Sequence, residues 1–404
     1  MNKSLKGPIK GFALGIYDGP HATPKESNDG PVFLGIKNVT PDGRLDLSEI
    51  RHVSEQDFPK WTRRVTPQKD DIVFSYEATL HRYAMIPEGF RGCLGRRMAL
   101  VRPDMTKVNP QFLLYYFLAS KWRAFVESNV INGATVDRIP IKKFPEFEVE
   151  LPALELQGLI VSAISSYDAL IENNRRRIQL LEQSAKLLYK EWFIRLRFPG
   201  HEHVKIIDGA PEGWEHVNVP DVIEINPTEH LERVSIVRYI QMACLSETGM
   251  SINVAEVEPR DKATSVKFRN GDVLLARITP CLENGKTAYV NFLGTDEVAC
   301  GSTEFIVLRG RQVSPYFTYC LARTHDFREN AIKSMIGSSG RQRVQVSCFD
   351  EFGIGLPPKP LLDQFDEFAA SCFSMITNLQ RQNEQLMRAR DLLLPRLMNG
   401  EIAV

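Results

Sequence analysis

The chain contains one sequence pattern twice, and this internal repeat limits its possible folds more than any other feature. Residues 108–112 (VNPQF) match residues 313–317 (VSPYF) at an offset of 205 positions. The same offset relates Arg138-Ile139 to Arg343-Val344, Phe144 to Phe349, Phe147 to Phe352, and Leu151-Pro152 to Leu356-Pro357. Residues 71–73 resemble residues 272–274 at an offset of 201, so the copies differ in their insertions. A chance likeness between two β-rich segments is the alternative, but the sustained offset favours two units of the same fold.

Each copy combines a mixed globular region with a long helix. Short β-type runs separated by turn residues come first, for example at 31–36, 71–76 and 272–276, and a helical stretch follows at 110–127 with a counterpart from Pro315. This mixture predicts an α+β fold. The predicted divisions are residues 1–150 for the first globular domain, 151–198 for the first long helix, 199–355 for the second globular domain and 356–404 for the second long helix.

Both long helices carry a seam of residues at alternating spacings of four and three, which is the pattern of a coiled coil. The first seam consists of Ile160, Ile164, Tyr167, Ile171, Asn174, Ile178, Leu181, Ala185, Leu188 and Trp192. The second seam consists of Phe365, Ala369, Cys372, Ile376, Leu379, Asn383, Leu386, Arg390, Leu393 and Leu397. Pro199-Gly200 ends the first helix, and Pro395 is expected to end or kink the second, which would place Leu397 outside the regular seam.

The two seams bury each other if the helices form an antiparallel coiled coil between the two domains. A pseudo-twofold axis relating the copies would place positions whose numbers add up to 557 opposite each other. The expected pairs are Trp192 with Phe365, Tyr167 with Arg390, Ala185 with Cys372, and Asn174 with Asn383. Facing asparagines would fix the register by hydrogen bonding. The alternative is that each helix packs only on its own globular domain.

A paired-helix rod suggests a use for the repeat. Residues 160–192 would span about 50 Å as a helix. DNA presents equivalent major-groove faces about 34 Å apart. Two similar domains on a rod therefore suit a DNA site made of two parts with an unread spacer.

Composition adds few constraints. Lys+Arg and Asp+Glu are both 50, so DNA binding would need local basic patches. The 7 cysteines are scattered and include no CxxC pair, which disfavours a zinc or disulfide framework and fits a reducing cytoplasm. The first ten residues do not form a secretory signal, and no stretch is expected to reach the roughly 20 apolar residues of a membrane helix.

With these features the chain resembles the specificity subunits of type I restriction–modification systems. The resemblance covers nearly the whole chain. Its most typical segments are residues 276–288 (ARITPCLENGKTA), 301–305 (GSTEF) and 389–402 (ARDLLLPRLMNGEI), together with 171–176 (IENNRR) and 188–193 (LYKEWF) of the first helix. The second copy opens with residues 211–214 (PEGW), for which the first copy has no equivalent tryptophan, and this departure leaves the role of residues 1–10 open.

The resemblance implies two target-recognition domains, residues 1–150 and 199–355, that each recognise one half of a bipartite double-stranded DNA target. It implies that the helices are the spacer and the docking surface for two methyltransferase subunits, which methylate adenine at N6 with S-adenosylmethionine. Motor subunits with nuclease activity, which use ATP and magnesium, would complete the restriction complex. The chain itself would bind no cofactor or metal and would not be an enzyme.

No catalytic motif is evident. An amino-methyltransferase needs an Asp/Asn-Pro-Pro-aromatic tetrapeptide, and the only Pro-Pro, at 357–358, stands between Leu356 and Lys359. Residues 285–287 (GKT) do not complete a phosphate-binding loop, because Pro280 stands where the motif needs glycine. An enzyme with an unfamiliar site is therefore a disfavoured alternative, beside a coiled-coil scaffold or assembly protein that does not recognise DNA sequence.

Basic and polar residues of both copies are the candidates for DNA contacts, since Arg and Lys bind phosphate, Arg pairs with guanine and Gln pairs with adenine. In the first copy they are His21, Thr23, Lys25, Arg63, Arg64, Arg91, Arg96 and Arg97. In the second copy they are Arg277, Asn284, Lys286, Thr287, Ser302, Thr303, Arg341, Gln342 and Arg343. Residues 175–177 (RRR) of the first helix are candidates for phosphate contacts across the spacer. For each of these residues a surface salt bridge or a solvated charge is the alternative.

Overall fold

Two compact units make up the chain. The computed structural model describes residues 4–25, 27–131, 133, 136–207, 209–231, 236–261, 265–338, 340–398 and 401–402. Unit 1 comprises Met1–Ile171 with Gln385–Val404, and unit 2 comprises Glu172–Glu384. The boundary falls within both long helices, so each unit joins one globular region to parts of both helices.

Unit 1 combines short strands with short helices. Its strands are β1 (Leu5–Pro8), β2 (Ala13–Asp18), β3 (Ser27–Leu34), β4 (Arg51–His52), β5 (Ile72–Ser75), β6 (Tyr83–Met85), β7 (Gly92–Leu94), β8 (Met98–Pro103) and β9 (Glu148–Leu151). Its short helices are η1 (Ile9–Phe12), η2 (Ile36–Asn38), α1 (Phe58–Trp61), α2 (Pro110–Leu118), α3 (Ser120–Glu127) and η3 (Phe144–Glu146).

Unit 2 repeats this plan. Its strands are β10 (Ile206–Ile207), β11 (Ala210–Pro211), β12 (Glu215–Asn218), β13 (Ile223–Ile225), β14 (Val237–Ile240), β15 (Glu258–Arg260), β16 (Val266–Arg269), β17 (Val273–Ala276), β18 (Thr287–Tyr289), β19 (Val298–Gly301), β20 (Phe305–Gly310) and β21 (Gly353–Leu356). Its short helices are η5 (His201–His203), α5 (Val219–Val222), η6 (Met242–Cys244), η7 (Val254–Glu256), α6 (Pro315–Ala322), α7 (His325–Lys333) and η8 (Val346–Phe349).

The main sheets of the two units have the same strand order, although the second sheet has three strands in unit 1 and four in unit 2. A four-stranded sheet has the order β2-β8-β5-β6 in unit 1 and β13-β20-β17-β18 in unit 2. A second sheet contains a parallel pair, β3 with β7 in unit 1 and β14 with β19 in unit 2. An early strand of each copy pairs with the strand that precedes the long helix, β1 with β9 and β12 with β21. The predicted α+β fold, present twice, is confirmed.

The repeated VNPQF and VSPYF segments are the start signals of equivalent helices. In unit 1 the side chain of Asn109 accepts hydrogen bonds from the backbone N–H groups of Gln111 and Phe112, and α2 begins at Pro110. In unit 2 the side chain of Ser314 accepts from the N–H of Phe317. A capping side chain followed by proline satisfies the free donors of the first turn, since proline has no N–H to satisfy. The aromatic residue at the end of each segment is buried in its core.

The repeated aspartate before β5 and β17 is a second shared device. Asp71 is 1% exposed; it accepts from the N–H of Gln68 and from two nitrogens of Arg102 at 2.8 Å each. Asp272 is equally buried; it accepts from the N–H of Arg269 and from two nitrogens of Arg309 at 2.7 Å each. A buried carboxylate is tolerable only with such full pairing. The repeat therefore preserves a complete ion-pair motif.

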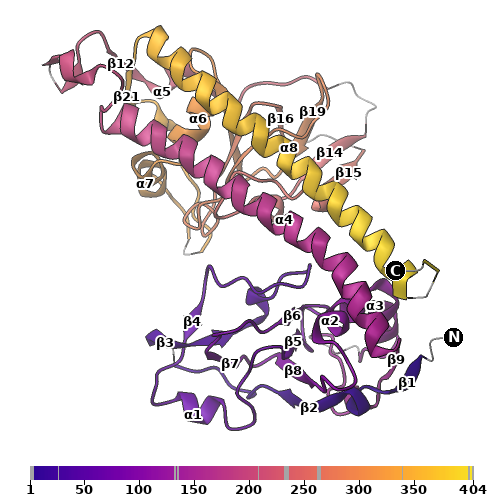
Figure 1. Cartoon of the computed structure of the whole chain (residues 1–404). Coiled ribbons are helices and arrows are strands. Elements are labelled where there is room, and N and C mark those ends of the chain that lie inside the picture. The colour runs from indigo at the N-terminus through magenta and orange to yellow at the C-terminus, as the bar shows by residue number, and fades with distance from the viewer. Residues whose placement is uncertain are drawn as a thin grey trace. The chain divides into compact units, whose positions relative to one another are not determined.

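The long helices are α4 (Leu154–Tyr189), which continues into the π-helical turn η4 (Lys190–Ile194), and α8 (Lys359–Met398). Every predicted seam residue is buried or half-buried. In unit 2, where the two helices lie side by side (Figure 1), the side-chain amide of Asn174 donates to Oδ1 of Asn383 at 3.1 Å. Residue numbers 174 and 383 add up to 557, as predicted, and the Asn–Asn pairing is confirmed.

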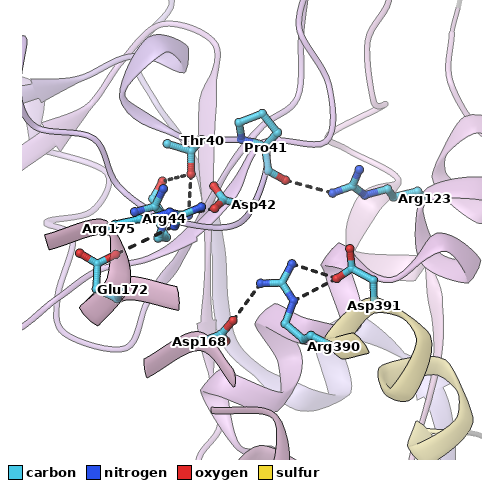
Figure 2. Close-up of polar contacts among 10 residues, drawn as sticks. All are labelled: Thr40, Pro41, Asp42, Arg44, Arg123, Asp168, Glu172, Arg175, Arg390 and Asp391. Atoms are coloured by element: carbon cyan, nitrogen blue, oxygen red, sulfur yellow. Dashed lines mark hydrogen bonds and ion pairs between the residues drawn. The ribbon is translucent and has the colours of Figure 1, made fainter. Parts of the chain in front are cut away.

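Unit 1 contains an independent contact with nearly the same register. Figure 2 shows Arg390 of α8 between Asp168 of α4 and its neighbour Asp391. Arg390 Nη1 lies 2.8 Å from Asp168 Oδ1, and these residue numbers add up to 558. A nearly constant sum means that the helices run antiparallel in both units. The predicted partner Tyr167 is one position off, because an ion pair to Asp168 satisfies the half-buried guanidinium and a tyrosine ring would not.

Two further details of the seam were predicted wrongly. Phe365 contacts the rings of Phe193 and Tyr189, with centroids 5.1 and 5.9 Å apart, in place of Trp192. The reason is η4, whose wider turn contains one more residue per hydrogen-bonded loop and shifts the side chains that follow. Helix α8 also continues through Pro395 to Met398, and Leu397 is only 5% exposed. Pro395 removes one backbone hydrogen bond from α8, and burial of Leu397 in the unit 1 core stabilises the last turn despite this loss.

Each globular region is also fastened to the helices, so the interpretation that each helix packs on its own domain describes part of the structure. In unit 1 the hydroxyl of Tyr115 donates to Asp168 at 2.5 Å. In unit 2 the hydroxyl of Tyr319 and the N–H of Met250 donate to the buried carboxylate of Glu182. Packing between helices and packing onto globular regions thus occur together.

One stretch, Leu154–Ile194, is long and apolar enough to meet a membrane-span criterion, contrary to the expectation from the sequence. This is weak support for a membrane span, because the seam of this helix lies in protein cores and accounts for its apolar residues. The charged residues 175–177 also lie within the stretch.

Replacing Asn174 with leucine is expected to lower the stability of unit 2 by about 1–3 kcal/mol, because the carboxamide of Asn383, 5% exposed, loses its partner. Replacing both asparagines with leucine is expected to restore stability, since two leucines suit a seam. Hydrogen exchange of α4 amides in urea measures both effects. A double variant as unstable as the single one would contradict this account.

Candidate nucleic-acid interface

A corner where strand β5 ends brings three segments of unit 1 together. The N–H of Tyr76 donates to the carbonyl of Arg97 at 3.1 Å, and the carbonyl of Tyr76 accepts from Ile139 at 2.7 Å. The N–H of Ala78 donates to the carbonyl of Asp137 at 3.0 Å. These bonds hold the residues after β5 against the turn before β8 and the segment before η3.

Unit 2 builds the same corner at the end of β17. The N–H of Arg277 donates to the carbonyl of Glu304 at 2.8 Å, and the carbonyl of Arg277 accepts from Val344 at 2.9 Å. The N–H of Thr279 donates to the carbonyl of Gln342 at 3.0 Å. We call these regions the strand-end corners: residues 76–78, 95–97 and 137–139 in unit 1, and residues 277–279, 302–304 and 342–344 in unit 2.

The unit 1 corner is polar and basic around a tyrosine. The hydroxyl of Tyr76 donates to the carbonyl of Arg96, and the ring of His21 lies edge-on at 6.3 Å. Asp18 forms an ion pair with Arg64 at 2.5 Å, and its carboxylate lies 3.3 Å from Nε2 of His21. Burial, and next the nearby negative charge of Asp18, raise the pKa of Tyr76 to about 12, so its hydroxyl is a fixed neutral donor at physiological pH.

Three arginines of the unit 1 corner keep their charges available. Arg96 and Arg138 are exposed and Arg97 is half-buried. Within the described part of the chain, none of the three forms an ion pair, and Nε of Arg97 is buried without a hydrogen-bond partner. An uncompensated cluster of guanidinium groups attracts phosphate and the edges of guanine bases.

In unit 2 the equivalent corner contains a paired arginine. Nε and Nη2 of Arg343 donate to the carboxylate of Glu304 at 2.7–3.0 Å. Ser302 Oγ accepts from the N–H of Glu304, and Nε of Arg277 donates to the carbonyl of Val344 at 3.1 Å. The side chain of Gln342 is half-buried beside this pair.

The structure therefore gathers about half of the predicted DNA-contact residues at the two corners. His21, Arg64, Arg96 and Arg97 meet in unit 1, and Arg277, Ser302, Thr303, Gln342 and Arg343 meet in unit 2, with Arg341 adjacent in sequence. Thr23, Lys25 and Arg63 are exposed near them in sequence. The proposed DNA contacts of all these residues stay predictions.

Other predicted residues lie elsewhere. Arg91 forms a bidentate ion pair with Glu55, at 2.5 and 2.6 Å, and its guanidinium lies over the ring of Phe58. Nζ of Lys286 donates to the carbonyl of Met242 at 3.0 Å, and Asn284 donates to Glu247. Thr287 is fully buried in β18, so its side chain does not reach the surface. Asn284, Lys286 and Thr287 stabilise the fold of the 279–287 loop, because the first two side chains bind neighbouring segments and the third is buried in the core.

Sequence reasoning missed Tyr76, Arg138 and Glu304 as corner residues. A signal was present for Arg138, since the repeat aligns it with the candidate Arg343. Tyr76 and Glu304 are recognised as corner residues only once the strand order of the sheets is known, and no motif in the sequence indicates that order. Among the described residues, no group of three His, Cys, Asp or Glu side chains could hold a metal ion.

Comparison with known proteins adds independent information. Residues 35–183, which include the unit 1 corner, match the model of the type I restriction modification DNA specificity domain. The type I restriction enzyme MjaIX specificity subunit of Methanocaldococcus jannaschii is 24% identical over 96% of this chain and 87% of its own length. The EcoEI specificity subunit of Escherichia coli is 30% identical over 37% of this chain and 26% of its own length.

Among solved structures, the type I restriction–modification system S subunit from M. genitalium superposes with a TM-score of 0.49 at 13% identity, covering 98% of this chain and 96% of that one. The family-model match and the near full-length sequence match to MjaIX agree with the repeated domain, the paired helices and the typical segments of both copies. Residues 35–183 are thus similar to the type I restriction modification DNA specificity domain, and the chain is similar over nearly its whole length to a type I restriction enzyme specificity subunit.

Proposed function

We propose that this chain recognises a DNA target made of two half-sites, one at each strand-end corner. The observation that carries the proposal is a shared backbone frame with different side chains. Equivalent positions hold Tyr76 and Arg277, Arg96 and Thr303, Arg97 and Glu304, and Asp137 and Gln342. A constant frame with exchanged polar side chains is what recognition of two different base sequences requires, because base edges differ in their donors and acceptors.

We further propose that the chain acts through partners and performs no chemistry itself. Two methyltransferase subunits would bring S-adenosylmethionine and modify adenine at N6, and motor subunits would bring ATP, magnesium and nuclease activity. The exposed face of α4 and of the η4 turn that follows it supports such docking. In unit 2 Leu180, Leu187 and Ile194 are 55%, 58% and 46% exposed and recur every seven residues. Exposed apolar residues at this spacing suit contact with another helix.

The helices would set the distance between half-sites. Both α4 and α8 continue without interruption through the unit boundary. The paired asparagines fix their register. Longer helices would then give a longer spacer of unread DNA between the two half-sites.

Methylated adenines in host DNA, mapped with and without this gene, test the function directly. We expect methylation at a bipartite sequence that disappears on deletion. Purified chain with its methyltransferase partner should also bind the target duplex with a strong salt dependence, since each phosphate contact contributes about 0.9 to the slope of log K against log salt. Binding that ignores both salt and sequence would favour a scaffold and contradict the proposal.

A further inference from the structure

The two strand-end corners share one arginine, but its neighbour differs in charge. The backbones of Arg138 and Arg343 form equivalent bridges, Arg138 with Glu77 and Arg343 with Ile278. At the neighbouring equivalent position stands Arg97 in unit 1 and Glu304 in unit 2. The same cation is therefore free in one unit and paired in the other.

Glu304 fixes the orientation of Arg343. Nε and Nη2 are both bound, while Nη1 makes no hydrogen bond within the residues that the structure describes. The side chain of Arg343 is 46% exposed and that of Glu304 is 22% exposed, so the free edge of the guanidinium faces solvent. An exposed ion pair adds little to folding stability. Its main physical effect is to restrict the rotamers of Arg343.

Arg138 lacks this restriction. It is exposed beside Arg96 and Arg97, and in the described part of unit 1 no carboxylate pairs with any of them. A group of mobile cations suits phosphate, which is bound by charge with little directional demand. Guanine instead presents O6 and N7 at fixed positions, and two N–H groups of one oriented guanidinium match them.

We infer that Arg343, positioned by Glu304, recognises a guanine edge in its half-site, whereas Arg138 with Arg96 and Arg97 binds backbone phosphate. The inference rests on the proposed function, because it assigns roles within the same DNA site. A guanidinium already held in one orientation loses less entropy on binding, which favours the specific contact. Glu304 acts through Arg343 and is a positioning residue.

Lysine substitution separates the two roles, because lysine keeps the charge and loses the planar fork. In the full chain with its methyltransferase partner, assayed on a randomised duplex library, Arg343→Lys should lower the preference for guanine at one position by roughly five- to 150-fold. The salt slope should not change. Glu304→Gln should lower the same preference at the same position.

The equivalent substitutions in unit 1 should behave differently. Arg138→Lys keeps the charge, so it should leave base preferences unchanged and should weaken all duplexes alike by less than Arg138→Ala does. Arg138→Ala should weaken all duplexes alike and reduce the salt slope by about 0.9. Arg311→Lys and Glu224→Gln form the matched control, because this pair of an exposed arginine and a half-buried glutamate, 3.2 Å apart, lies in unit 2 outside the corner. The control variants should bind like the unmodified chain.

Three outcomes would overturn the inference. A base preference that survives Arg343→Lys would remove the guanine contact. Higher affinity of Glu304→Gln for all duplexes alike would mean that Glu304 masks Arg343 and does not position it. Loss of base preference in Arg138→Lys would show that Arg138 recognises a base, whereas the inference gives it a phosphate contact. An unmodified complex that shows no sequence preference at all would instead overturn the proposed function.

Discussion

A chain with seven residues added to each long helix is expected to recognise the same two half-sites separated by about three more base pairs. Seven helical residues add about 10.5 Å at 1.5 Å each, and base pairs are spaced about 3.4 Å apart. Duplicating residues 165–171 in α4 and 385–391 in α8 keeps the seam and leaves the Asn174–Asn383 and Asp168–Arg390 pairs within their own units. The original target should lose specific binding, since its half-sites no longer fit both corners.

Methylation mapping of cells that carry the lengthened chain measures the new spacer. The matched control adds seven residues after Gly200, an exposed left-handed residue that follows the first helix. This longer loop should leave the target unchanged, because it does not lengthen the seam. Methylation of the original sequence by the helix-lengthened chain would refute the idea that helix length sets the spacer.

Removing the buried aspartate of unit 1 should destabilise that unit more than the equivalent change destabilises unit 2. Asp71→Ala leaves Arg102 without a carboxylate and the N–H of Gln68 without its acceptor. Breaking a buried ion pair in this way costs about 3–5 kcal/mol. In Asp272→Ala, Glu229 still lies 2.6 Å from Nη1 of Arg309, so the loss should be smaller.

Native-state hydrogen exchange in the full chain resolves the two units separately. Protection of β5 and β8 should fall in Asp71→Ala, and protection of β17 and β20 should fall less in Asp272→Ala. Asp71→Asn is the control, since an amide oxygen can still accept from Gln68. Equal losses at both sites would show that Glu229 does not compensate.

Much of the fold could be predicted because it depends on short-range patterns. The capping residue and proline at 109–110 and at 314–315 predict equivalent helix starts. The seam spacing predicts the antiparallel pairing and the register of the two asparagines. The errors lie where local geometry departs from the regular period. At the π-helical turn Phe193, and not Trp192, contacts Phe365. Burial of Leu397 outweighed the helix-breaking tendency of Pro395.

The candidate site was harder to predict, since its members come from three separate segments of each copy. Arg96 and Arg97 attract attention as a basic pair, but only the strand order brings them to Tyr76 and Arg138. Charge alone also selected Arg91, whose carboxylate partner lies 36 positions away, and Thr287, whose neighbours bury it. The partner of a side chain across a sheet depends on the strand order, and the type of that one residue does not reveal it.

The division of both helices between the units also affects the order in which the protein can fold. Residues 172–384 are contiguous, so unit 2 has all its parts once Glu384 has left the ribosome. Unit 1 must wait for Leu394 and Leu397, which complete a core begun more than two hundred residues earlier with Ile160 and Ile164. A premature stop codon shortly after position 384 would thus damage the domain encoded at the start of the gene and spare the one encoded beside the stop.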